Sequence, residues 1–105
     1  MLVNTIKAIS GGGSMTPILD TSTTMGGSAT VHTSTIKADD ATFIVAYFRL
    51  NTNYVYPVIA DVSGGTITIR ENQIITVSKD ASGYITFSST NTTTTNGKTL
   101  YVIIY

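Results

Sequence analysis

The segment Ala41–Leu50 reads ATFIVAYFRL, and the closing segment Leu100–Tyr105 reads LYVIIY. In an extended strand, successive side chains point to opposite faces, so a strand with one face in water alternates apolar and polar residues. Neither segment alternates in this way, because each is apolar on both faces. Both strands therefore need cover on two sides. In a chain of 105 residues, we expect part of that cover to come from other copies of the same chain.

The composition favours one small β domain over a disordered chain. Charged residues make up 11% of the sequence and the formal net charge is zero, whereas about a quarter of the residues in ordinary soluble domains are charged. The hydrophobic content of 42%, with many Ile and Val residues, argues against disorder. We predict a single β domain over residues 1–105. The alternative hypothesis is that residues 1–40, which are mostly polar, form an extended N-terminal arm.

The distribution of charge and apolar residues excludes several kinds of partner. The six basic residues are scattered singly along the chain, whereas phosphate binding needs a cluster of Lys and Arg. No basic amphipathic stretch fits a membrane surface. No apolar run approaches the roughly 18 residues that a bilayer-spanning helix requires. The sequence therefore predicts neither a nucleic-acid partner nor a membrane partner.

β-Branched residues dominate the chain, and short turns recur at the spacing that is typical of antiparallel β proteins. This pattern predicts an all-β fold, an antiparallel β-sandwich or small barrel of about seven to eight strands. Pro17–Asp20 reads as a short edge segment, and Ala29–Lys37 as an exposed or edge strand. The predicted strands are Leu2–Ile9, Ala29–Lys37, Thr42–Leu50, Tyr54–Val62, Thr66–Glu71, Gln73–Lys79, Tyr84–Ser89 and Thr99–Tyr105.

The clearest hairpin joins Thr42–Leu50 to Tyr54–Val62 through a three-residue loop, which pairs Leu50 with Tyr54 and Phe48 with Tyr56. Pro57 cannot donate a backbone hydrogen bond, so it predicts a local edge or a bulge. One face of the hairpin is the predicted core: Ile44, Ala46, Phe48, Leu50, Tyr54, Tyr56, Val58, Ala60 and Val62. The other face is also largely apolar: Phe43, Val45, Tyr47, Arg49, Val55, Pro57, Ile59 and Asp61.

The second apolar face predicts a contact between subunits, because monomers rarely expose contiguous apolar patches larger than a few hundred Å². We expect a homo-oligomer, with a trimer as the first hypothesis. For the six tyrosines, the favoured role is core packing, followed by subunit contact. Sugar stacking ranks third, because carbohydrate platforms commonly use Trp and the chain has none. The predicted interface residues are Phe43, Val45, Tyr47, Tyr101, Ile103 and Tyr105.

The residue types needed for catalysis or metal binding are scarce. Without cysteine, the chain has no disulfide, thiolate metal site or cysteine nucleophile. His32 is the single histidine and Glu71 the single glutamate, whereas acid–base catalysis needs paired titratable groups. We therefore predict a protein that is not an enzyme, with no cofactor and no metal, and we interpret His32 as an exposed structural residue.

Three polar segments have simpler explanations than a functional site. Asp39 and Asp40 read as turn residues, although carboxylates from distant turns could in principle bind calcium. Gly11–Gly13 lacks the Lys-Ser/Thr that follows the glycines of a phosphate loop, so it reads as a flexible connection. Thr90–Lys98 reads as a polar loop that tolerates substitution.

Two short pieces carry a resemblance to a known class of protein. Gly83–Phe87 (GYITF) and Asn96–Tyr105 (NGKTLYVIIY) are similar to the closing hairpins of phage fibre domains and of head- or tail-decorating domains. The composition of the whole chain likewise resembles small all-β virion structural proteins of tailed bacteriophages. The pieces contain no motif that assigns a role to a particular residue.

The resemblance implies a non-enzymatic virion structural protein: a capsid decoration, head fibre or tail-associated subunit. Its partners would be copies of itself and other virion proteins. Met1–Ser10 has no basic start followed by a long apolar run, so we expect synthesis in the host cytoplasm without a signal peptide, and a final location in the virion. The alternatives are a glycan-binding module that recognises a host surface glycan, and a bacterial adhesin domain, which the missing signal pattern disfavours.

Overall fold

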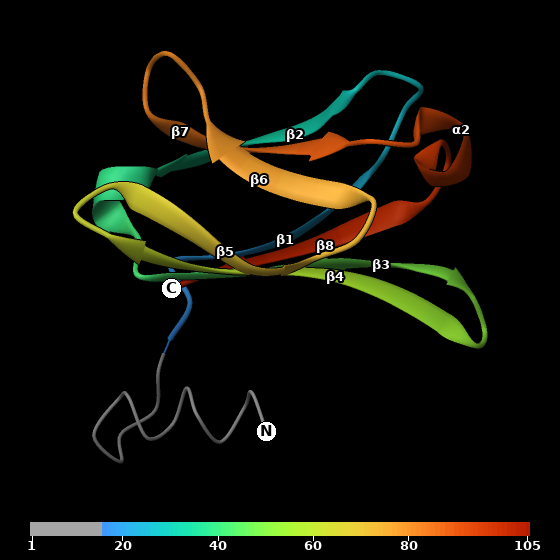
Figure 1. Ribbon diagram of the computed structural model, residues 1–105, viewed down its shortest axis with the longest axis horizontal. Helices are drawn as coiled ribbons and strands as arrows, with labels where there is room; N and C mark the ends of the chain where they lie inside the picture. The colour runs from blue at the N-terminus through green and yellow to red at the C-terminus, as the bar shows by residue number, and fades with distance from the viewer. Residues whose placement is uncertain (1–15) are drawn as a thin grey trace.

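The computed structural model describes residues 16–105, so the predicted strand Leu2–Ile9 and the glycine-rich Gly11–Gly13 lie outside the described residues. The described residues form eight strands in two antiparallel sheets, which stack as the two layers of a β-sandwich (Figure 1). The predicted all-β sandwich is thus confirmed. Packing two sheets face to face gives each sheet one inner face, which is buried in a shared core, and one outer face.

The large sheet has five strands and the small sheet has three. In spatial order, the large sheet contains β1 (Leu19–Thr24), β8 (Thr99–Ile104), β3 (Phe43–Asn51), β4 (Tyr54–Ser63) and β5 (Thr66–Asn72). The small sheet contains β2 (Thr30–Lys37), β7 (Tyr84–Ser89) and β6 (Ile75–Lys79). Two one-turn helices, η1 (Ala38–Asp40) and α2 (Thr92–Thr95), lie at opposite ends of the sandwich (Figure 1).

The core lies between the inner faces of the two sheets. Strand alternation places every second residue of β3, β4 and β8 inward, and the small sheet adds aliphatic and aromatic side chains from β6 and β7. The predicted core face of the hairpin is confirmed apart from Tyr54, whose side chain is 57% exposed. The largest fully buried side chains are Met25, Ile44, Phe48, Val58, Ile75, Ile85, Phe87, Thr95, Leu100, Val102 and Ile104.

Tyr54 escapes burial because the register of the hairpin shifts near its tip. The predicted pair Phe48–Tyr56 is present, but an irregularity after Arg49 pairs Tyr54 with Asn51, and the predicted pair of Tyr54 with Leu50 is wrong. Pro57 lies where β4 has a local edge, because the pairing of β4 with β5 begins at Val58. A missing backbone donor at this position therefore breaks no bond to β5.

The chain crosses from the large sheet to the small sheet between β5 and β6. Strand β5 continues to Asn72, one residue beyond its predicted end at Glu71, and Asn72 pairs with Val58. The chain turns at Gln73 and Ile74, and Ile74 has a φ of 68°. A β-branched residue rarely adopts this left-handed conformation, and here it lets the chain leave one sheet and enter the other within two residues.

Residues 19–37 belong to the sandwich. Strand β1 pairs with β8 at six consecutive positions, and β2 pairs with β7. The arm alternative for residues 1–40 therefore does not describe residues 19–37, because backbone pairing fixes them in the two sheets. Strand β2 lies at an edge of the small sheet, as its polar sequence predicts.

The predicted polar loop Thr90–Lys98 contains helix α2. The side chain of Asn91 accepts a hydrogen bond from the backbone N–H of Thr94, which caps the helix. Thr95 is fully buried, and its hydroxyl lies 2.8 Å from the Ser89 hydroxyl in a hydrogen bond. The prediction that this whole segment tolerates substitution is therefore wrong at Thr95, because the sequence pattern does not show that the segment covers the end of the core.

Candidate functional site

The outer face of the large sheet gathers all six predicted interface residues on two adjacent strands. Strand β3 contributes every second residue from Phe43, and β8 contributes every second residue up to the end of the chain. Val45 pairs with Ile103 and Tyr47 with Tyr101. Phe43 and Tyr105 exchange two backbone hydrogen bonds, with N···O distances of 3.2 and 2.8 Å. The six side chains therefore form three cross-strand pairs on one face.

Strand β4 extends this apolar surface on the other side of β3. Ile59 lies opposite Val45, and Pro57 lies opposite Tyr47. The rings of Tyr47 and Tyr101 stack with centroids 5.1 Å apart, and Tyr101 is 42% exposed. The alternation of the hairpin places Ile59 and Pro57 on this face, although they were not among the predicted interface residues.

The apolar centre of the outer face is flanked by polar residues on both edge strands. Strand β1 places Asp20, Ser22 and Thr24 outward, opposite the outward residues of β8. Strand β5 places Thr68 and Glu71 outward, opposite Asp61 and Ile59. An apolar centre with a polar rim is the usual anatomy of a protein–protein interface.

On the outer face, the acidic side chains and the basic side chain that is unpaired among residues 16–105 lie at opposite ends of the strands. The carboxylates of Asp20, Asp61 and Glu71 lie level with Phe43 or Val45, towards one end of β3. Arg70 compensates Asp61, with its Nε 2.6 Å from Asp61 Oδ2. At the other end of β3, Arg49 is exposed and its Nη1 donates a 3.4 Å hydrogen bond to the Thr52 carbonyl oxygen. Among residues 16–105, Arg49 makes no ion pair with a carboxylate.

The outer face of the small sheet has the opposite chemistry. Because Ile85 and Phe87 of β7 point into the core, the residues between and beside them point outward. Cross-strand pairing aligns them in rows of hydroxyl groups. These rows are Thr33–Thr86–Ser78 and Thr30–Ser88–Thr76, and Lys37 pairs with Tyr84 at the end of the strand. Thr86, at the centre of one row, is buried and its hydroxyl donates a 3.1 Å hydrogen bond to the Tyr84 carbonyl oxygen, whereas Thr33 and Ser78 beside it are exposed. This face is therefore polar, in contrast to the outer face of the large sheet.

His32 is placed differently from its prediction. It pairs with Phe87 in register, and the two ring centroids are 6.1 Å apart. Its Nε2 is buried and has no hydrogen-bond partner within the described residues. Burial lowers the pKa of His32 below its ordinary value of 6.5. The prediction of an exposed histidine is therefore wrong, because β2 turns this side chain towards the inner face.

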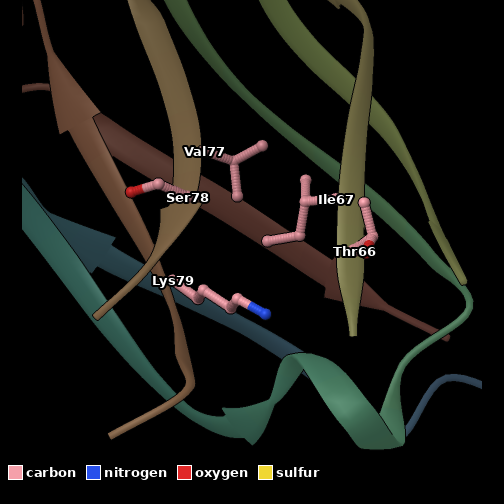
Figure 2. A pocket seen from close by; sticks show the side chains of 5 residues that line it. All are labelled: Thr66, Ile67, Val77, Ser78 and Lys79. Carbon is pink, nitrogen blue, oxygen red and sulfur yellow. The ribbon is translucent and has the colours of Figure 1, made fainter. Parts of the chain in front are cut away.

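Two shallow hollows lie away from the outer face. One, of about 390 Å³, opens between β5 and β6, where Ile67 and Val77 approach each other and Lys79 reaches across (Figure 2). The Lys79 Nζ donates a 2.8 Å hydrogen bond to the Gly65 carbonyl oxygen. The second, of about 290 Å³, is lined by Lys37, Ala38, Asp39, Lys79, Asp80, Ala81, Ser82 and Gly83. Neither hollow is lined by tyrosine or asparagine.

The acidic residues do not gather into a site in the part of the chain that the structure describes. Asp39 and Asp40 belong to η1, and Asp80 Oδ1 accepts backbone hydrogen bonds from Ser82 and Tyr84 within its own turn. No group of three or more His, Cys, Asp or Glu side chains is placed to hold a metal ion in residues 16–105.

No protein-family model, no curated protein and no solved structure matches this chain. Within residues 16–105, no helix has the length and apolarity to span a membrane. The outer face of the large sheet is therefore the strongest candidate site on the evidence of its own geometry.

Proposed function

We propose that this chain is a non-enzymatic structural subunit of a tailed-phage virion, a capsid decoration, head fibre or tail-associated protein that acts through the outer face of the large sheet. The observation that carries the proposal is the contrast between the two outer faces. One presents three apolar cross-strand pairs and the other presents rows of hydroxyl groups. A surface of the first kind is typical of a subunit that is covered by a partner.

The outer face is suited to recognition by shape. Its central residues are carried by three hydrogen-bonded strands, so the surface is rigid and needs little ordering when it binds. Tyrosine is enriched in interface centres, where its large ring is buried and its hydroxyl keeps a polar contact. Tyr47, Tyr101 and Tyr105 bring this type of side chain to the centre and end of the face.

The assignment to a virion is supported by the composition and by the resemblance of Gly83–Phe87 and Asn96–Tyr105 to the closing hairpins of phage fibre and decorating domains. In the structure, these pieces contain the first four residues of β7, the central strand of the small sheet, and all of β8, which lies next to β3. The partners on this proposal are copies of the chain and other virion proteins.

The test is to purify phage particles from the source of the sequence, detect the chain by peptide mass spectrometry and locate it by immunogold electron microscopy. Labelled particles are the expected result. The double variant Tyr101→Ser with Ile103→Thr should be lost from the particles, whereas Tyr54→Ser, which removes an exposed tyrosine away from the outer face, should remain. Particles that contain no trace of the chain would refute the proposal.

The glycan-binding alternative has weaker support. A sugar stacks on a free aromatic ring face, but Tyr47 already covers one face of the Tyr101 ring. The two described hollows contain no tyrosine. Binding of a host glycan by wild type that Tyr101→Ser abolishes would favour this alternative.

A further inference from the structure

We infer that the outer face of the large sheet packs against the same face of a second copy, about a two-fold axis that crosses the strands. The inference rests on the proposed function and names the partner of that same face. A two-fold contact uses one surface twice, so the surface has to be complementary to itself in shape and in charge.

The area of the face reaches the lower limit for a specific pair. Five strands spaced about 4.8 Å apart, each contributing about six residues at about 3.3 Å per residue, cover roughly 480 Å². Two such faces bury roughly 1,000 Å², the lower limit for a specific interface. Flat sheet faces stack at about 10 Å separation with their side chains interdigitated, as the two sheets of a sandwich do.

The central position of β3 determines which strands come together about the two simplest axes. Strand β3 is the central strand of the large sheet, with β8 and β1 on one side and β4 and β5 on the other. An axis along β3 therefore places β1 of one copy on β5 of the other, at the same level along the strands. An axis across the strands places each strand on the same strand of the partner, for example β3 on the partner's β3, and the two strands then run in opposite directions.

Charge excludes the axis along β3. That arrangement would place Arg49 on the partner's Arg49, because β3 would lie on itself without exchange of its ends. It would also place Asp20 over the partner's Glu71, since both residues lie level with Val45. Both contacts bring like charges together, which opposes association.

The axis across the strands gives favourable contacts instead. When it passes midway between Val45 and Tyr47, Val45 lies over the partner's Tyr47. Arg49 then lies over the partner's Phe43, beside the partner's Asp61. Asp20 lies over the partner's Ser22, so the acids of one edge no longer face each other. The unpaired cation at one end of each face thus meets the acidic end of the other.

This pair differs from the trimer hypothesis drawn from the sequence. In a pair each face is covered by the other, whereas three faces around a three-fold axis meet at angles and leave their edges uncovered. Sedimentation equilibrium of the full chain should therefore give twice the chain mass of 11.1 kDa. Tyr101→Ser should raise the dissociation constant at least tenfold, as expected for an interface tyrosine, and Tyr54→Ser should leave it unchanged.

Cysteine cross-linking tests the axis directly, because the chain contains no cysteine of its own. We expect a mixture of Arg49→Cys and Phe43→Cys chains to form a disulfide-linked pair on oxidation, and neither variant to link to itself. Tyr105→Cys, at the same level as Phe43, replaces Phe43→Cys if that variant does not fold. Tyr54→Cys is the matched control for random collision.

Several results would overturn the inference. In sedimentation, a monomer or a trimer at millimolar concentration would overturn it. In cross-linking, a disulfide between two Arg49→Cys chains would overturn it. So would outer-face cysteines that link only to a cysteine placed in Met1–Ser14 of the same chain. A monomer that is nevertheless found in phage particles would refute the pair while leaving the proposed function intact. A pair with the expected cross-links that is absent from particles would refute the proposed function alone.

Discussion

The outer faces of the large and small sheets differ in chemistry, although both sheets cover the same core. On the large sheet the outward residues of β3 and β8 are mostly aromatic and aliphatic, whereas on the small sheet they are mostly Thr and Ser. Both faces follow the same two-residue alternation, so the fold itself does not require the difference. Burial in the core explains why the inner face of each sheet is apolar. The apolar outer face of the large sheet indicates a second contact, which the polar outer face of the small sheet does not need.

The largest expected effect compares the two faces of one strand, β8. Val102 is fully buried between the sheets, and its neighbour Ile103 lies on the outer face. Val102→Asp should lower the free energy of unfolding by more than about 4 kcal/mol and prevent folding, because it buries an unpaired charge. Ile103→Asp should fold but remain monomeric. Circular dichroism melting and light scattering measure both, and unfolding of Ile103→Asp would show that the outer face stabilises the monomer itself.

The next effect concerns the place where the two sheets meet. Gly65 has a φ of 79° in the turn between β4 and β5, and a Cβ atom there would overlap Asp39 Oδ1 of η1. Gly65→Ala should cost about 2 kcal/mol, mostly from backbone strain, because the exposed Asp39 carboxylate can rotate away from the added Cβ atom. Gly64→Ala has a similar backbone conformation but open space around it, so it should cost about 1 kcal/mol. Chemical denaturation measures both, and equal losses would show that the Asp39 carboxylate moves away at no cost.

A smaller effect separates buried from exposed threonine. Thr95→Val keeps the shape of a fully buried side chain but removes its hydrogen bond to Ser89, so it should cost about 1–3 kcal/mol. The same change at Thr33, on the hydroxyl face of the small sheet, should change the free energy of unfolding by less than about 0.5 kcal/mol. Thermal melting of the two variants tests this. A large loss at Thr33 would mean that the hydroxyl face also has a structural partner.

The smallest effect is a pH dependence from His32 in the small sheet. Burial lowers its pKa in the folded state, so the unfolded chain takes up the proton first as the pH falls below its ordinary value of 6.5. The contribution of neutral His32 to the free energy of unfolding should be fully present above pH 6.5. It should decrease as the pH falls towards the lower pKa of the folded state, and below that folded pKa this group should cause no further loss. Melting temperatures of wild type and His32→Gln across this range isolate the effect. Parallel profiles would exclude His32 as its source.

Several features of the candidate site follow from the sequence because alternation along a strand is local. The apolar residues at every second position of Ala41–Leu50 and Leu100–Tyr105 predict a second apolar face before any neighbour is known. The core side of the hairpin is predicted by the same rule. Tyr54 is the exception, because a register shift after Arg49 depends on the geometry of the turn rather than on the alternation.

Other features depend on segments that are distant in the sequence. A polar run such as Thr90–Lys98 has no apolar pattern that would predict burial, and Thr95 is buried only because α2 lies over the end of the sandwich. His32 has Thr and Ser neighbours in the sequence, and only the pairing of β2 with β7 places it beside Phe87. In both cases the surroundings of the side chain come from other strands.

The sequence by itself determined the β class of this protein, the inner faces of its central strands and the presence of a second apolar surface, because these depend on side-chain alternation within single strands. Only the tertiary structure decided that β8 lies beside β3, so that Tyr101 stacks on Tyr47, and that the small sheet covers one face of the large sheet and, among residues 16–105, leaves the other face uncovered. The physical reason is that backbone hydrogen bonds join any two strands equally well. The choice of neighbours is therefore made by burying all the inner faces together, and no single segment of the sequence contains it.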